Sequence, residues 1–124
     1  MSLSGDPIRE GILQYFTEDH LQIKEMAREF AEGELKPRAA EIDETGEFPL
    51  DIFIQMGELG LFGLAYPEEY GGAGLDVTSY IIGVEEIHRI CASTGLSYAA
   101  HVSLSCYPMY AFGNEEQKHK YLPD

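Results

Sequence analysis

The apolar residues of this chain recur at α-helical spacing, and this periodicity most limits the folds that the chain can adopt. After Thr17, which can cap a helix, one stripe follows the i, i+3, i+4, i+7, i+8 pattern of a half-buried helix. Its members are Ile23, Met26, Ala27, Phe30 and Ala31. Pro37 should kink or break this helix near Leu35, because proline lacks a backbone N–H and clashes with an earlier carbonyl.

Start and stop signals divide the remainder into further helices. A second helical piece is expected to reach about Asp43, and another to begin at Pro49 and end at Gly60. Residues 60–75 hold five glycines and a proline, which predicts an irregular stretch. Three more starts are expected at Asp76, at Ser93 or Thr94, and at Asn114, where Gln117 completes a capping box. The sequence therefore predicts an all-α bundle of five or six helices.

The two long helices after residue 76 carry most of the remaining apolar residues. In the first, the predicted inward stripe is Val77, Tyr80, Ile81, Val84 and Ile87. Glu85 and Arg89 are expected to pair one turn apart. In the second, Leu96, Ala100 and Leu104 form a strip about 12 Å long at 1.5 Å per residue. Spacing alone favours core packing of this strip over a ligand-binding wall, and Pro108 should free the Leu104 carbonyl.

Charge excludes several classes of partner. The 124 residues include 8 Lys and Arg against 22 Asp and Glu, a net charge of −14. Nucleic acids and anionic membranes both require clustered cations, so neither is expected as a partner. The longest apolar run, residues 59–66, is too short to cross a bilayer.

Two cysteines make no disulfide framework, which indicates a reduced, intracellular protein. Residues 1–15 are expected to be a tag or a disordered segment preceding a single domain at 16–124.

Three local motifs suggest chemistry that their surroundings do not support. Glu85 and His88 form one E-x-x-H motif, but a di-metal bundle needs two copies and further carboxylates. The glycine-rich residues 71–74 lack phosphate-loop spacing and nearby cations, which favours a plain connector. Ser97 follows Gly95 as in a nucleophile elbow, but no strand precedes it. A metal-binding bundle and a non-catalytic helical interaction module remain as alternatives to an enzyme.

Several sequence segments, in their order along the chain, resemble the N-terminal domain of the acyl-CoA dehydrogenase family. Their motifs are most similar to those of the isovaleryl-type members. The matching segments are residues 30–32, 35–40, 58–64, 67–75, 85–87, 112–118 and 121–123. The resemblance implies an all-α domain that precedes a β-domain and a second helical domain absent from this chain. It also implies an FAD-dependent oxidoreductase that converts acyl-CoA thioesters to trans-2-enoyl-CoA.

The same resemblance carries expectations about partners and the site. Electron-transferring flavoprotein would reoxidise the flavin, and the full-length protein would be a tetramer. The cytoplasm, or the mitochondrial matrix in a eukaryote, is the expected location. The catalytic glutamate and the main FAD contacts are expected outside this chain, which alone should be inactive. The residues expected to bind the acyl group are Leu96, Ser97, Ala100 and Leu104.

Overall fold

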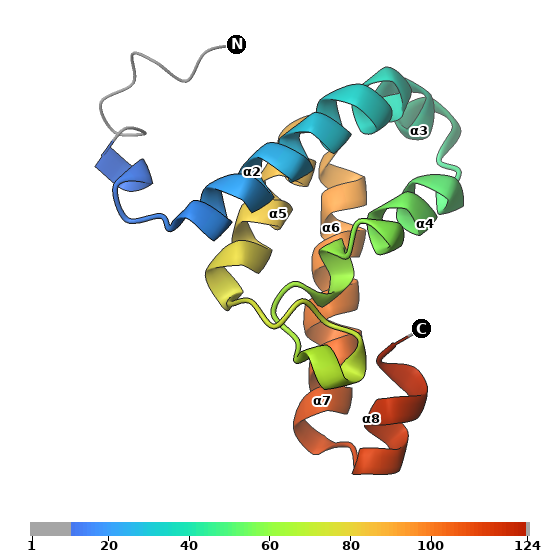
Figure 1. Ribbon diagram of the computed structural model, residues 1–124. Coiled ribbons are helices and arrows are strands. Elements are labelled where there is room, and N and C mark those ends of the chain that lie inside the picture. Colours follow the sequence, from blue (N-terminus) through green and yellow to red (C-terminus); the bar gives the residue numbers. More distant parts are fainter. Residues whose placement is uncertain (1–10, 124) are drawn as a thin grey trace.

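The computed structural model describes residues 11–123 and, within that range, contains helices and no strand (Figure 1). The α-helices are α2 (Glu18–Phe30), α3 (Ala39–Thr45), α4 (Leu50–Glu58), α5 (Val77–Ile90), α6 (Ala92–Ala100), α7 (Tyr107–Phe112) and α8 (Glu115–Tyr121). Two π-helices, η1 (Ala31–Leu35) and η5 (His101–Cys106), and three 3₁₀ turns, η2 (Lys36–Arg38), η3 (Leu61–Gly63) and η4 (Glu68–Tyr70), connect them. The predicted all-α class is confirmed. Within the expected N-terminal tag, residues 11–13 form a helical turn and residues 14–15 a turn, and residues 1–10 lie outside the described residues.

Helix α2 lies alongside α5, and both begin at the predicted caps (Figure 1). The Thr17 side chain accepts a hydrogen bond from the His20 backbone N–H, and the His20 ring accepts one from the Thr17 N–H. Ala27, Phe30 and Ala31 of the predicted stripe are buried in the core. This reciprocal capping satisfies backbone donors that a helix start otherwise leaves free.

Pro37 changes the type of helix without ending it. The chain passes from α2 through the π-helix η1 and the 3₁₀ turn η2 into α3. In the π-helix the Lys36 N–H donates to the Ala31 carbonyl, five residues earlier. The run ends at Thr45, two residues beyond the predicted Asp43, and the following Gly46 has a φ of 67°, in the left-handed region that glycine adopts without strain.

The predicted inward face of α5 is wrong at two positions. Val77 and Ile81 are exposed, whereas Ser79, Ile82, Gly83, Glu86 and Ile87 are buried. Polar Ser79 and Glu86 can occupy inward positions because both are hydrogen-bonded there, Ser79 to the Asp76 carboxylate and Glu86 to cations of α2. The expected Glu85–Arg89 pair is also wrong, since Arg89 pairs with Glu86 and Glu32.

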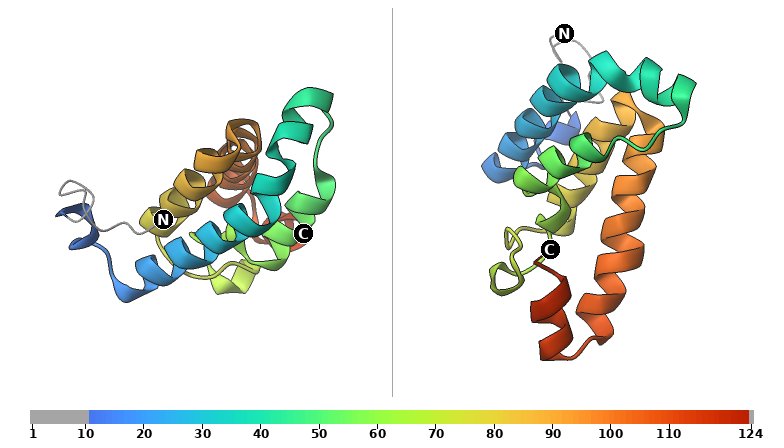
Figure 2. Two further views of the ribbon diagram at one scale, coloured as in Figure 1. Left: turned by 90° about the horizontal axis from the view of Figure 1, so that it is seen from above. Right: turned by 90° about the vertical axis from the view of Figure 1, so that its right-hand side faces the viewer.

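The second long helix is continuous from α6 through η5 to α7 (Figure 2). Its buried side is anchored by Tyr98, whose hydroxyl donates to the Leu61 carbonyl at 2.8 Å, and by Val102, whose carbonyl accepts from the Tyr66 hydroxyl at 2.7 Å. Leu96 and Leu104 are 66% and 75% exposed. The expectation that their strip packs in the core is therefore wrong.

The glycine-rich turn at residues 71–74 is a connector, as predicted. The backbone N–H groups of Gly72, Ala73 and Gly74 donate to carbonyls of Pro67, Gly63 and Tyr66 at 2.8–3.0 Å. These donors are therefore already engaged and do not face an anion. A Cβ at position 72 would overlap the Tyr66 carbonyl, so this close approach requires glycine.

Candidate acyl-binding groove

An apolar groove of about 690 Å³ lies between α4 and the helix formed by α6 and η5. One side is lined by Phe48, Leu50, Phe53, Ile54 and Phe62, and the other by Ser97 and His101. The size and the mainly apolar lining are typical of pockets that bind small organic ligands.

Helix α4 positions the apolar side of the groove because its two faces have different partners. Ile52 and Met56 are buried in the core, so neighbouring Phe53 and Ile54 face outward toward the groove. The aromatic rings form a continuous row with centroid separations of 4.5 Å between Phe48 and Phe53 and 5.9 Å between Phe53 and Phe62. The ring of His101 then lies 5.0 Å from that of Phe62, edge to face.

The structure separates the four residues expected at the acyl site. Ser97 lines the groove, whereas Leu96, Ala100 and Leu104 are not among its lining residues. Leu96 and Leu104 instead present their side chains at the surface, and Ala100 is half-buried. Sequence reasoning missed His101, and it also missed the aromatic side chains from residues 48–62. The recurrence of phenylalanine at positions 48, 53 and 62 is the sequence signal that could have indicated this aromatic row.

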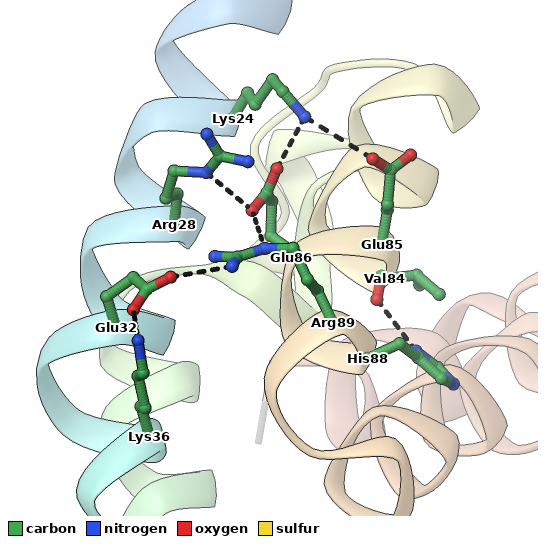
Figure 3. Close-up of polar contacts among 9 residues, drawn as sticks. All are labelled: Lys24, Arg28, Glu32, Lys36, Val84, Glu85, Glu86, His88 and Arg89. Atoms are coloured by element: carbon green, nitrogen blue, oxygen red, sulfur yellow. Dashed lines mark hydrogen bonds and ion pairs between the residues drawn. The ribbon is translucent and has the colours of Figure 1, made fainter. Parts of the chain in front are cut away.

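Glu85 and His88 do not face a shared ion. Glu85 points toward Lys24, 3.7 Å away, and the His88 Nδ1 hydrogen-bonds the Val84 carbonyl at 2.8 Å (Figure 3). The described residues contain no group of three or more His, Cys, Asp or Glu placed to hold a metal. The geometry therefore gives the metal-binding alternative no support.

The adjacent Glu86 instead joins α2 to α5 (Figure 3). Its fully buried carboxylate accepts from Lys24 at 2.6 Å, Arg28 at 3.1 Å and Arg89 at 3.2 Å. Burial opposes ionisation of Glu86, but the hydrogen bonds from Lys24 and Arg28 outweigh it and hold its pKa below the usual range. This cluster is structural and lies apart from the groove residues.

The comparisons with known proteins agree with the fold. The sequence profile described as "Acyl-CoA dehydrogenase, N-terminal domain" matches residues 17–124. The chain belongs to the acyl-CoA dehydrogenase family. It is 53% identical over 106 residues to the probable acyl-CoA dehydrogenase YngJ of Bacillus subtilis, covering 86% of this chain and 28% of that relative. The chain thus spans less than a third of the relative's length.

Two solved structures that resemble this chain share its arrangement of helices. A chain in the electron transferring flavoprotein structure from Acidaminococcus fermentans matches with a TM-score of 0.85 and 49% identity over 87% of this chain and 28% of that one. The acyl-CoA dehydrogenase of Bacillus anthracis, complexed with FAD, matches with a TM-score of 0.82 and 37% identity over 89% and 19%. None of the described helices of this acyl-CoA dehydrogenase domain is both long and apolar enough to span a membrane.

Proposed function

We propose that this chain is the N-terminal helical part of an FAD-dependent acyl-CoA dehydrogenase that oxidises acyl-CoA thioesters to trans-2-enoyl-CoA. The groove between α4 and α6 carries the proposal, because it offers an apolar surface of the size that an acyl chain would occupy. Family membership supplies the reaction class. FAD, when bound, accepts the hydride that leaves the β-carbon.

Within this function, the chain's own residues bind and shield the acyl group. Ser97 and His101 form one wall of the groove and the phenylalanines form the other. The wall would be extended outside the groove by Leu96, Ala100 and Leu104. Covering the exposed leucines with another part of the protein or with the ligand would be favourable, because it removes apolar surface from water. We assign no catalytic residue to this chain.

The glycine-rich turn of this domain does not offer a phosphate site for FAD. The glycine-rich turn at 71–74, which is the segment most like a phosphate loop, has its N–H groups bonded to neighbouring carbonyls. We therefore propose that FAD is held mainly by parts of the longer protein beyond this domain. We further propose electron-transferring flavoprotein as the electron acceptor and a cytoplasmic or mitochondrial-matrix location, in keeping with the relatives found. A tetrameric full-length protein is proposed from the family resemblance alone.

The test is substitution of the groove wall in the complete protein. Ser97→Phe places a ring in the groove and should lower kcat/KM for acyl-CoA oxidation at least about tenfold. Phe112→Ala is the matched control, because Phe112 is 86% exposed and does not line the groove. Dye-coupled oxidation and flavin absorbance would be measured. Absence of bound flavin and of activity in the unaltered protein would refute the proposal.

A second candidate is a non-catalytic interaction module. The exposed Leu96 and Leu104 favour it, because isolated helices often dock through such apolar strips. Under this alternative the complete protein would be colourless and inactive, and Leu104→Ser would weaken its binding to a helical partner.

A further inference from the structure

Tyr70 lies away from the groove, at the point where η4, α7 and α8 meet. It is 5% exposed and is not among the residues that line the groove. Its hydroxyl donates to the Glu115 carboxylate of α8 at 2.7 Å. Its ring meets those of Tyr110 in α7 and His119 in α8 edge to face, with centroids 6.1 Å and 5.0 Å away. We call these contacts the Tyr70 cluster. One side chain thus holds the last two helices against η4 through both its polar and its aromatic parts.

Lys118 of α8 adds charge to the Tyr70 cluster. Its Nζ lies 5.7 Å from the centre of the Tyr70 ring, within the range of cation–π attraction, and 3.5 Å from Glu115. The hydrogen bond to Glu115, followed by burial, raises the pKa of Tyr70 to about 12, and the same bond lowers the pKa of Glu115. A neutral phenol therefore donates to an ionised carboxylate at neutral pH, which is the stronger kind of hydrogen bond.

The chain passes this cluster again after α8 has ended. A Cβ at Gly71 would lie 3.3 Å from the Cα of Pro123, so Pro123 contacts the residue that directly follows Tyr70. Gly71 also has a φ of 85°, a conformation that side chains other than glycine rarely adopt. The start of α8 is thus held through Glu115, and the segment after its end is held through Pro123. Both ends of α8 therefore depend on residues 70–71.

We infer that Tyr70 and Glu115 are positioning residues, which orient the part of the complete protein that follows this domain relative to the acyl groove. The inference rests on the proposed function, in which the groups that react with the acyl chain lie beyond this domain. Those groups can react only while they are aligned with the acyl chain in the groove. A fixed α8 limits the directions in which the following part can leave the domain, and it thereby raises the aligned fraction.

The test compares Tyr70→Phe and Glu115→Ala with the unaltered complete protein on butanoyl-CoA and octanoyl-CoA. Each substitution removes one partner of the hydrogen bond and leaves the groove lining unchanged. We expect kcat to fall about threefold to tenfold and KM to stay within about twofold, because alignment is lost while the groove still binds. The double variant should lose no more than either single variant, since both substitutions remove the same bond.

Two further substitutions in the first turn of α8 are the controls. Glu115→Gln keeps an oxygen that can accept from the Tyr70 hydroxyl, so its kcat should stay within about twofold of the unaltered value. Glu116→Ala removes the neighbouring acidic residue, which is exposed and is not the partner of Tyr70. It changes the charge near the helix start by the same amount and should alter neither kcat nor KM.

Hydrogen–deuterium exchange of the complete protein provides a readout that does not depend on activity. In Tyr70→Phe and in Glu115→Ala, the amides of residues 115–122 should exchange about threefold to tenfold faster, because the end of the domain opens more often. The amides of α4, which line the other side of the groove, should exchange at an unchanged rate. Unchanged exchange of residues 115–122 would refute the inference.

The activity outcomes separate the inference from the function on which it rests. If the unaltered protein oxidises neither thioester, the proposed function fails and the inference fails with it. If the protein is active and residues 115–122 exchange faster while kcat is unchanged, the Tyr70 cluster is only structural and the inference alone is refuted. A raised KM at constant kcat, or an equal loss in Glu116→Ala, would likewise refute the inference alone.

Discussion

Glu86 is a buried residue that joins α2 to α5. Its carboxylate is 0% exposed and has three cationic partners drawn from both helices. The preceding residue, Glu85, has the same chemistry but is exposed, with one longer contact at 3.7 Å. The two neighbours therefore provide a matched comparison of a buried and a solvated carboxylate.

Removal of the buried carboxylate should be strongly destabilising. Glu86→Ala leaves Lys24, Arg28 and Arg89 facing an unneutralised buried site, and we expect a loss of about 3–5 kcal/mol in the free energy of unfolding. Glu85→Ala should change it by less than about 1 kcal/mol. Urea denaturation followed by circular dichroism measures both. Equal losses in the two variants would contradict the structural role assigned to Glu86.

Single-residue roles were only partly predictable from the sequence. Ser97 was predicted at the acyl site and lines the groove, but the acyl-binding role itself stays a prediction. His101 was missed because an isolated histidine gives no periodic signal, and only the fold brings it against Phe62. Glu86 and Glu85 are indistinguishable in sequence, because burial depends on which face of α5 meets α2.

At the scale of elements, Asp76 couples the start of α5 to the start of α2. Its carboxylate caps α5 by accepting from the Ser79 N–H at 2.8 Å, and it also lies 2.8 Å from the His20 ring that caps α2. The hydrogen bond from the Ser79 backbone, followed by that from His20, lowers the pKa of Asp76 to about 2 from 3.8. The ionised carboxylate is therefore favoured by the folded state.

This coupling predicts a pH dependence of stability. The contribution of Asp76 is fully present above about pH 3.8 and is lost as the pH falls toward about 2, because the folded-state pKa is the lower one. Asp76→Asn keeps a capping side chain but does not titrate, so its stability should fall less over this window. Urea midpoints across the window measure the difference. Parallel curves for the two proteins would contradict the coupling.

Three helix starts were predicted correctly, whereas the start of α6 falls at Ala92 and not at the expected Ser93 or Thr94, and helix types were not predictable. Thr17, Asp76 and Asn114 cap helices as expected, because capping depends on residues within one turn. The π-helices η1 and η5 were missed, since apolar spacing assumes 3.6 residues per turn. The i, i+4, i+8 strip from Leu96 to Leu104 runs into η5, where the wider turn shifts the register.

The whole molecule carries more negative charge than its ion pairs neutralise. With a net charge of −14, the compact state is opposed by general repulsion among carboxylates. The buried contacts of Glu86 are screened much less by salt than this surface repulsion is. The stability of this protein should therefore rise with ionic strength, whereas the stability of a protein held together by surface ion pairs should fall.

Raising NaCl from about 0.05 M to about 1 M should accordingly raise Tm by a few degrees, since the Debye length then falls to about 3 Å. Differential scanning calorimetry at constant pH measures the shift, and the same ionic strength reached with KCl controls for specific ions. A lower Tm at high salt would show that surface attraction outweighs repulsion.

The π-helix η5 has a consequence for tolerance to changes in length. A π turn holds one residue more than an α turn, so this helix could lose a residue within 101–106 and remain helical. The residues after the deletion would keep nearly their present direction, because the shortened α turn completes the same full rotation as the π turn. The seating of α8 against η4, where Tyr70 bonds Glu115, would then be kept. A deletion in one of the ordinary α turns would instead rotate all following residues by about 100°.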